Sequence, residues 1–571
     1  MKLKTLATAI TASTLLFACS DDDDNNAEKK IIEPASMTLI GRFNADQELD
    51  EGLSEIVTYH KTSQSILVIN AKDSVIDVLD ASTLTSEALA NPLSGSNLTR
   101  RSTLDVSENV AASGGINSVA VHGNLMAVAV ENDDKQANGF IAFYTLNDQG
   151  SPTFQKTVNA GALPDNVVFT HDGAYALSAN EGEPSGDYTN DPEGSVTIVP
   201  IANGLAGTPQ QVSLNVFNAG QPKAEQGAAA RVTHPEASVA QDLEPEYIAI
   251  SADNKKAYVS LQENNAIAVI DIENATAERL FSLGEKDHGI EGNGLDASNK
   301  DDAINIQTYD NVFGLYMPDT IAAYRVNGTN YIVTANEGDS REYAYSATEA
   351  ECDAAGHDFD DGDCFSWVDE KSAGKLDLDE TVFPDADALQ ENEKLGKIKA
   401  VVTEGDVDND EKYEKVVVFG ARSFSIFNAD NGTRVFDSGD DFEQITKTRL
   451  GEKGFNATND ENGFDDRSDN KGPEPEALAL GTVNGITYAF VGLERTGGIM
   501  MYDISNPAQS EFLEYTVNRD FETDIETNFA AAGDLAPEGM KFVDATDSPT
   551  GNALLIVGNE VSGTTTVYEV K

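Results

Sequence analysis

The sequence predicts an all-β protein, a β-propeller of seven or eight four-stranded blades. From about residue 36 onward, short stretches of alternating apolar and polar residues are separated by Gly, Asn, Asp and Pro turns. Long helical periodicity is nearly absent. Related units also recur along the chain, and each contains three recognisable strands that are often followed by a fourth. Radial closure of such units leaves few exposed sheet edges, which favours a propeller.

The repeat is clear in segment 163–188 (LPDNVVFTHDGAYALSANEGEPSGDY), which indicates two short strands joined by a tight turn. Eight units begin at Ser54, Asn117, Leu163, Pro245, Pro318, Glu414, Pro475 and Pro537. The unit at Glu414 is degenerate, so there are seven blades if it merges with its neighbour. The last unit lacks a fourth strand, and segment 37–43 (MTLIGRF) is expected to supply it and close the ring. A stacked solenoid is the alternative, but its repeats are usually shorter and more regular.

Three long interruptions break the repeat pattern, at about 274–316, 344–392 and 436–471. Segment 344–392 is acidic and contains Trp367, Cys352 and Cys364. A close pair of cysteines in an exported protein predicts a disulfide between Cys352 and Cys364. Zinc is disfavoured because the six histidines are scattered and no CxxC or HExxH spacing occurs. Long loops on a rigid β scaffold are usually where binding or catalysis is built.

The charge is strongly acidic, with 98 Asp and Glu against 38 Lys and Arg and a formal net charge of −60. Such a chain repels phosphates and anionic lipid headgroups, which argues against nucleic acid partners and peripheral membrane binding. One interpretation is a solvated acidic surface suited to a salty exterior. Another is that bound divalent cations neutralise part of the charge. We expect both interpretations to apply, with most of the acids on the solvated surface and a smaller number bound to cations.

The N-terminus predicts export. Residues 1–4 are basic, and a mostly apolar run too short to span a bilayer follows. The sequence Leu16-Phe17-Ala18-Cys19 resembles the lipobox of bacterial lipoproteins. This resemblance implies a signal peptide at 1–18, a lipid on Cys19 as the one membrane attachment, and, because Ser20 follows, the outer membrane. A plain secretory signal is the alternative. Residues 19–35 are expected to be a flexible acidic tether, and 36–571 the propeller.

Several linked motifs resemble the choice-of-anchor I family of exported bacterial proteins, and in part the broader YVTN-type surface propellers. They include segment 163–196, MPDTIAAYRVNGTNYIVTANEGDSREY from Met317, GARSFSIF from Gly420 and RSDNKGPEPEALA from Arg467. The resemblance covers nearly all of the chain after the tether. It implies a surface-attached propeller whose biochemical role is poorly defined. Some members of this family carry alkaline-phosphatase-like names or occur beside phosphoesterase domains.

Acidic residues recur at the two ends of each strand pair. The start of the first strand lies beside the end of the second, and the first strand of a propeller blade lines the channel. These positions are therefore expected to converge on one mouth of the channel. The strand-entry set is Glu55, Asp165, Glu246, Asp319, Glu476 and Glu538, with Asn117 in the remaining unit. The strand-exit set is Glu131, Glu181, Glu263, Glu337, Glu494 and Glu560, with Asn70 near that point in the first unit.

Carboxylates that face one narrow mouth repel one another unless a cation neutralises them or some are protonated. Hard oxygen ligands without His or Cys favour Ca²⁺ over other metals. The predicted metal ligands are Asp165, Glu181, Glu183, Glu246, Glu263, Asp319, Glu337, Asp339, Glu474, Glu476, Glu494, Glu538 and Glu560. Asn180, Asn264 and Asn336 are expected to add neutral oxygens. The alternative is that most of these acids are structural and accept backbone N–H bonds in blade turns.

Four arginines lie in or near the same motifs: Arg341, Arg422, Arg467 and Arg495. They are expected to pair with the acids, which is favoured, or to receive an anionic ligand. A second predicted Ca²⁺ site is a DxDxD loop formed by Asp406, Asp408, Asp410 and Glu414. It departs from the calcium-loop pattern at Glu411, where Gly is preferred, and its expected role is stabilising. The acidic run 358–363 is expected to be a solvated loop.

No familiar nucleophile motif is present: GxSxG, a Walker loop and a dinucleotide fingerprint are all missing. His288 is the histidine best placed near acids, although a solvated loop residue is the favoured interpretation. Two functions stay open. The favoured one is a non-enzymatic surface protein that uses Ca²⁺ to bind a small anionic ligand or a surface macromolecule. The alternative is a Ca²⁺-dependent phosphoesterase, alkaline-phosphatase-like or phytase-like, that uses metal-activated water.

Overall fold

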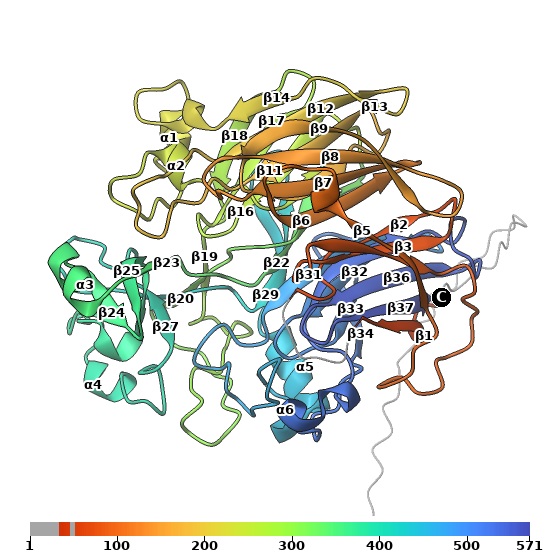
Figure 1. Cartoon of the computed structure of the whole chain (residues 1–571). Helices are drawn as coiled ribbons and strands as arrows, with labels where there is room; N and C mark the ends of the chain where they lie inside the picture. Colours follow the sequence, from red (N-terminus) through yellow and green to blue (C-terminus); the bar gives the residue numbers. More distant parts are fainter. Residues whose placement is uncertain (1–32, 46–51) are drawn as a thin grey trace, which may run out of the picture. The chain divides into compact units, whose positions relative to one another are not determined.

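The short alternating strands pair into mostly antiparallel sheets (Figure 1). The computed structural model describes residues 33–45 and 52–571. The predicted signal peptide, the lipidation site Cys19 and nearly all of the predicted tether lie outside the described residues. No helix within 33–45 and 52–571 is long and apolar enough to cross a membrane.

Within these residues, seven sheets have the strand order of propeller blades. Blades 1 to 4 are β2(Val57–His60)–β3(Ser65–Asn70)–β4(Val75–Asp80)–β5(Thr99–Asp105), β6(Ser113–His122)–β7(Leu125–Asn132)–β8(Asn138–Leu146)–β9(Pro152–Ala162), β10(Pro164–Phe169)–β11(Tyr175–Asn180)–β12(Ser195–Ala202)–β14(Gln210–Ser213) and β15(Ile248–Ile250)–β16(Lys256–Leu261)–β17(Ala266–Asp271)–β18(Thr276–Ser282). Blades 5 to 7 are β21(Ile321–Val326)–β22(Thr329–Asn336)–β29(Ser423–Asn428)–β30(Arg434–Asp437), β31(Pro475–Val483)–β32(Ile486–Leu493)–β33(Ile499–Asp503)–β34(Glu511–Thr516) and β35(Pro537–Val543)–β36(Ala553–Asn559)–β37(Thr564–Val570)–β1(Met37–Asn44).

The ring closes through the N-terminal strand, as predicted. Strand β1 pairs antiparallel with β37, and Met37 lies opposite Val570. In Figure 1 the red β1 lies beside the blue β37. The last blade therefore combines strands from both ends of the described chain, and β1 covers the edge that β37 would otherwise expose.

The expected eighth blade does not form, and the structure selects the seven-bladed alternative. The degenerate unit at Glu414 is divided between two sheets. Strand β28(Val416–Val418) pairs with β20(Val312–Leu315) and β27(Lys399–Val401), outside the blades. The rest of the unit, β29 and β30, completes blade 5 beside β22. A blade needs four consecutive partners, and this unit lacks the strands to supply them.

Two additional sheets are inserted around blade 5. One contains β19(Glu285–Asp287), β20, β28, β27 and β26(Glu370–Ser372), and the other contains β23(Glu342–Ser346), β25(Asp363–Val368) and β24(Asp358–Asp360). The short helices are α1(Ala224–Gly227), α2(Val239–Asp242), α3(Glu349–Ala355), α4(Ala386–Leu389), α5(Asp441–Arg449) and α6(Ile525–Asn528). The predicted Cys352–Cys364 disulfide is present and joins α3 to β25. The acidic run 358–363, predicted to be a solvated loop, is instead an exposed hairpin of β24 and β25.

The core lies between neighbouring blades. Leu67 and Ile76 of blade 1 pack with Val128 and Ala142 of blade 2, and all four are fully buried. Such central strands have apolar side chains on both faces, because each face meets a sheet. The seven innermost strands, β2, β6, β10, β15, β21, β31 and β35, together line the central channel. Their first residues consequently surround one end of it.

Candidate metal centre at the channel mouth

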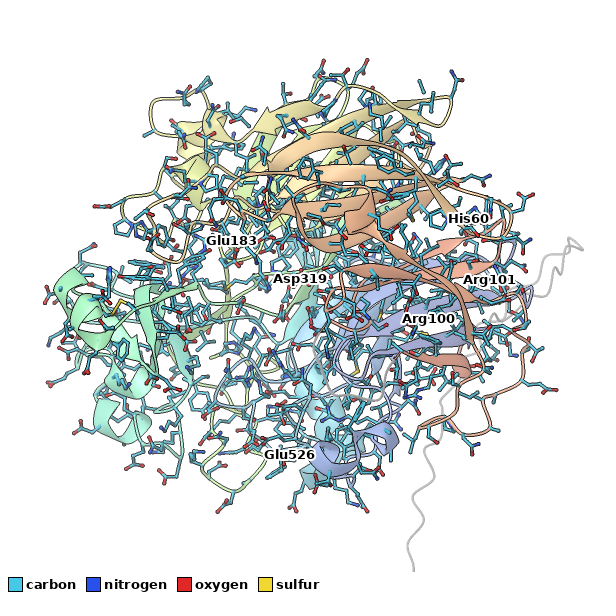
Figure 2. All side chains as sticks on the ribbon, viewed as in Figure 1. His60, Arg100, Arg101, Glu183, Asp319 and Glu526 are labelled. Atoms are coloured by element: carbon cyan, nitrogen blue, oxygen red, sulfur yellow. A yellow bond between two sulfur atoms is a disulfide. The ribbon has the colours of Figure 1, made fainter. Side chains whose placement is uncertain are left out.

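All seven strand-entry residues line a single cavity of about 460 Å³ at one end of the channel. Five of the six strand-exit acids line it as well: Glu181, Glu263, Glu337, Glu494 and Glu560. With Glu183 and Asp339 the cavity contains thirteen carboxylates, against the two basic side chains of Lys471 and Arg495. We call these thirteen acids the carboxylate ring. Figure 2 shows two of them, Glu183 and Asp319, near the middle of the view, where strands of several blades meet.

Local backbone geometry aims several strand-entry acids into the cavity. The pairing register shifts between Pro164 and Val167, between Pro475 and Leu478, and between Pro537 and Met540. The acids Asp165, Glu476 and Glu538 lie within these irregularities, and a β-bulge of this kind turns a side chain out of the regular pleat. The bulges were not predicted, although the repeated sequence Pro-Asp/Glu at the strand start marks their positions.

The residue before the proline is strained in four of these motifs. Leu163, Met317, Glu474 and Ala536 have φ of 47°, 42°, 53° and 57°. Residues with a β-carbon rarely adopt this left-handed conformation, which costs about 1–2 kcal/mol for each such residue. Strain of this kind persists only where the surrounding structure imposes it, and it concentrates at functional sites. The same left-handed conformation recurs beside the cavity, where it forms the turn before four of the inner strands.

Three ring acids come close enough to share one ion. Single carboxylate oxygens of Asp319, Glu337 and Glu476 all lie within 4.8 Å of one another. Asp319 and Glu337 begin and end the first strand pair of blade 5, and Glu476 begins that of blade 6. The set therefore joins two neighbouring blades. Its oxygen-only composition suits Ca²⁺, which takes carboxylate oxygens at about 2.3–2.6 Å.

Burial and mutual repulsion hold the ring acids toward the protonated form. Burial, with the nearby Glu560 and Asp165, raises the pKa of Glu55 to about 8. Burial and Glu183 raise the pKa of Asp165 to about 7, and burial raises that of Glu263 to about 7 despite the nearby Arg341. Burial also raises the pKa values of Glu181, Glu246, Asp319, Glu476, Glu494 and Glu538 well above their usual range.

Several ring oxygens accept no hydrogen bond from the described residues. One carboxylate oxygen each of Glu55, Glu246, Glu263, Glu476 and Glu538 is buried without a hydrogen bond to any described residue. Glu246 is only 9% exposed. An unpaired buried oxygen costs about 1–3 kcal/mol, more when charged. These five oxygens therefore do not accept the backbone N–H bonds that the structural alternative requires.

The basic residues near the mouth are already paired with acids. Lys471 Nζ lies 2.8 Å from Glu337, 3.3 Å from Glu474 and 3.4 Å from Asp339. Arg495 pairs with Glu494 at 3.1 Å and with Glu474 at 3.3 Å. Away from the cavity lining, Arg467 pairs with Glu474, Arg341 with Asp242 and Glu244, and Arg422 with Glu443. The prediction that these four arginines pair with acids is therefore confirmed.

Some residues predicted at the mouth occupy other positions. Glu474 is fully buried outside the cavity lining, and although burial opposes it, Lys471, Arg467 and Arg495 lower its pKa to about 2. One of its oxygens nevertheless lies within 4.8 Å of oxygens of Glu337 and Glu494, which makes a second three-acid set beside the first. Glu131 packs over Gly115 and pairs with Lys135 at 3.8 Å instead of lining the cavity. Asn70 caps a turn at Asp73. Asn180, Asn264 and Asn336 are buried and their amides brace adjacent segments, so they supply no oxygen to the cavity.

The DxDxD loop forms a separate cluster, in which oxygens of Asp406, Asp408 and Glu414 lie within 4.8 Å of one another. Asp410 is not part of this set. Glu411 has φ of 73°, which explains why calcium loops prefer Gly there. His288, expected to be a solvated loop residue, is instead buried. Its Nδ1 is 2.7 Å from the Asn293 carbonyl oxygen, and burial with Lys286 lowers its pKa to about 3. It does not line the cavity.

The choice-of-anchor I domain matches residues 55–507, which is most of the described propeller. The chain belongs to the choice-of-anchor I domain family. This membership, together with the seven blades, makes it a surface-associated propeller. The matched region includes the ring residues of blades 1 to 6 and every long insertion.

Two animal proteins are similar over parts of their length. Gigasin-3a of Magallana gigas is 29% identical over 194 residues, 32% of this chain and 67% of that protein. The mesenchyme-specific cell surface glycoprotein of Strongylocentrotus purpuratus is 29% identical over 307 residues, 50% of this chain and 38% of that protein. This chain therefore spans well under half of the second relative.

Solved structures resemble the chain more distantly. Kuenenia stuttgartiensis hydrazine synthase matches with a TM-score of 0.41 at 10% identity, over 91% of this chain and 97% of that one. The Myceliophteria thermophila Cps50 (Swd1) β-propeller domain matches with a TM-score of 0.37 at 8% identity, over 92% and 99%. At such scores they carry no statement about function.

Proposed function

We propose that this protein is a cell-surface binding propeller whose channel mouth holds Ca²⁺. The observation that carries the proposal is the convergence of thirteen carboxylates in one cavity, whose described lining includes two basic side chains, Lys471 and Arg495. From outside the lining, Arg341 reaches one more ring acid, Glu263, at 3.8 Å. A divalent ion bound by Asp319, Glu337 and Glu476 would displace protons from these acids and supply the positive charge that the cavity lacks. A Ca²⁺ ion held by protein oxygens keeps coordination positions for an outside ligand.

The ligand we propose is an anionic group on a small molecule or surface macromolecule, bound to the ion rather than to arginine or lysine. Lys471 and Arg495 already contact two or three carboxylates each, so little of their charge is free. A metal-free ring would repel an anion. Binding of the ligand is therefore expected to depend strictly on the cation.

The second candidate is a Ca²⁺-dependent phosphoesterase. The observation that favours it is Lys471, which lines the cavity beside Glu337 of the three-acid set and would face a phosphate bound to the ion. Binding remains the better-supported function because the lining residues contain no histidine, and neither Ser118 nor Thr320 has a histidine beside it in the lining to act as its base. An enzyme built here would use water activated by the metal or by a ring carboxylate.

The test starts from the full chain, freed of metal and then equilibrated with Ca²⁺ or Mg²⁺, and counts bound ions by elemental analysis. The double variant Asp319→Asn/Glu476→Gln removes two ligands with little change in volume. Its matched control, Asp148→Asn/Glu349→Gln, makes the same charge change at exposed positions. The proposal requires Ca²⁺ binding that the first variant loses and the control keeps. Equal binding by all three proteins would refute the ring as the metal site.

A phosphomonoester and phosphodiester panel on the same proteins separates the two candidate functions. Ca²⁺-dependent hydrolysis that disappears in Asp319→Asn/Glu476→Gln would establish the phosphoesterase. Ca²⁺ binding without hydrolysis supports the binding protein. Attachment through a lipid on Cys19, and an outer-membrane location, belong to the same proposal. Labelling with a fatty-acid analogue, lost in Cys19→Ala, tests the lipid.

A further inference from the structure

A second group of buried acids lies outside the carboxylate ring. Asp296 belongs to the loop between β19 and β20, Glu443 to α5, and Asn456 and Asp465 to the segment that precedes β31. The exposed fractions of these four residues are 1%, 1%, 0% and 2%. The loop before β20 and the segment from α5 to Asp465, which are far apart in sequence, therefore bring buried polar side chains together.

Glu443 is fully paired within this group. Its Oε1 accepts hydrogen bonds from Arg422 Nη1 at 2.6 Å and Asn456 Nδ2 at 3.0 Å. Its Oε2 accepts the Asp296 backbone N–H at 2.9 Å. Because a carboxylate only accepts, the contact with Asn456 must come from the NH₂ side of that amide. The orientation of Asn456 is fixed by the same contact and by a second one to Ser468 Oγ at 2.8 Å.

Two oxygens of the group lack partners among the described residues. Ser468 donates to Asp465 Oδ1 at 2.5 Å, which leaves Asp465 Oδ2 without a hydrogen bond. With its NH₂ directed toward Glu443 and Ser468, Asn456 leaves its Oδ1 unpaired as well. Buried polar atoms are paired in the great majority of cases, so two unpaired acceptors linked through one serine require an explanation.

The charge of the group is also unbalanced. Asp296, Glu443 and Asp465 supply three carboxylates, and Arg422 is the basic side chain that pairs with them, through Glu443. Three carboxylates and one guanidinium leave a formal charge of −2. Buried charge is ordinarily paired or bound to a metal, and the donors in question are all oxygens, which Ca²⁺ prefers.

We infer that Asp465 Oδ2, Asn456 Oδ1 and the Asp296 carboxylate hold a structural Ca²⁺ ion. The ion would link the loop before β20 to the segment before β31, with Arg422 and Glu443 completing the charge balance. The same segment continues through Arg467 to Lys471 and Glu474 beside the channel mouth. The site shares no ligand with the carboxylate ring or the DxDxD loop. A negative result for this site therefore leaves the proposed function untouched, and the reverse is also true.

The test uses the full chain with the three other acid groups that could hold an ion disabled: Asp319→Asn/Glu476→Gln, Glu494→Gln for the group of Glu337, Glu474 and Glu494, and Asp408→Asn. This background protein should retain one tightly bound Ca²⁺ ion per chain, counted after dialysis against metal-free buffer. Retention of none would overturn the inference. The background leaves every residue of the buried group in place, so its result does not depend on tolerance of a core mutation.

Asp465→Asn, added to the background, should remove the retained ion and weaken Ca²⁺ binding at least tenfold. The neighbouring Asp466→Asn is the control, because Asp466 is exposed and the chemical change is the same. If Asp465 is simply protonated, or if a water fills the gap, the isosteric asparagine leaves the ion count unchanged and the inference is wrong. If Asp465→Asn does not fold, Asn456→Ser removes the neutral ligand and is measured in its place, with the same required loss.

Discussion

Lys471 Nζ lies 2.8 Å from Glu337 Oε1 at the rim of the channel mouth. Glu337 is also the acid that completes the three-carboxylate set with Asp319 and Glu476. The lysine and a divalent cation therefore compete for the same carboxylate. This relationship connects the stability of the metal-free protein to its affinity for metal.

Replacing Lys471 by Met is expected to affect these two properties in opposite directions. Glu337 and Glu474 lose a buried partner, and breaking such pairs typically costs about 3–5 kcal/mol, so the metal-free variant should unfold at lower temperature. Ca²⁺ affinity should rise, because the ion no longer displaces an ammonium group. Thermal unfolding with a chelator and titration calorimetry measure the two effects. Weaker Ca²⁺ binding in Lys471→Met would show that the lysine is not a competitor.

The metal-free protein is expected to lose stability as the pH rises. Glu55, Asp165 and Glu263 have pKa values of about 8, 7 and 7, above those of unfolded Glu and Asp, about 4. The folded chain thus binds more protons than the unfolded chain at intermediate pH. Their stabilising contribution is complete below about pH 4 and disappears as the pH rises through 7 to 8. Unfolding temperatures in chelator between pH 5 and pH 9 should fall, and Ca²⁺ should reverse much of that fall.

A companion measurement checks the origin of this pH dependence. Ca²⁺ binding near pH 7 should release protons, because the ion displaces them from ring carboxylates. Calorimetric titrations in buffers of different ionisation enthalpy count these protons. No buffer dependence would mean that the ring is already ionised without metal.

The left-handed conformation of Ala536 predicts a stabilising substitution. Glycine adopts φ of 57° without strain, so Ala536→Gly is expected to raise the free energy of unfolding by about 0.5–1 kcal/mol. Ala477 is also fully buried but has no such conformation, and Ala477→Gly should lower it by a similar amount. Denaturant unfolding of the two variants gives the comparison. A destabilised Ala536→Gly would indicate that the alanine side chain contributes more by packing than its backbone costs.

The Cys352–Cys364 disulfide is expected to hold the insertion rather than the blades. It closes a short loop between α3 and β25, and in the chain-entropy account a loop of about 15 residues gains about 3 kcal/mol. Reduction, or Cys352→Ser/Cys364→Ser, should open segment 344–368 to protease while the blades stay resistant. Cleavage sites identified by mass spectrometry decide this. Cleavage spread over several blades would contradict it.

Most of the architecture could be predicted from local sequence pattern. The Pro-Asp/Glu starts at Asp165, Asp319, Glu476 and Glu538 indicated the inner strands, and MTLIGRF indicated closure. The number of blades could not be settled, because the strand at Val416 resembles a blade strand and only its partners, β20 and β27, show that it is not one. Strand β28 pairs with β20, which lies about a hundred residues earlier, and such long-range pairing leaves no local sequence pattern.

The site was predictable where it depends on strand ends and unpredictable where it depends on packing. Repetition at Glu246 and Glu263 indicated convergence, and both line the cavity. Glu474 occupies the same motif, but Arg467 and Lys471 from the segment before it and Arg495 from the next strand pair make it an ion-pair centre. Nothing in the sequence around Asp296 or Asp465 indicates that they belong to one buried group, because two irregular insertions bring the group together.

The most direct test of the central claim is a calorimetric titration of the metal-free full chain with Ca²⁺, compared with Asp319→Asn/Glu476→Gln. The wild-type protein should bind Ca²⁺ saturably, and the variant should lose at least one binding event. The exposed control variant, Asp148→Asn/Glu349→Gln, should titrate like the wild type. Indistinguishable titrations of the wild type and Asp319→Asn/Glu476→Gln would contradict a metal centre at the channel mouth.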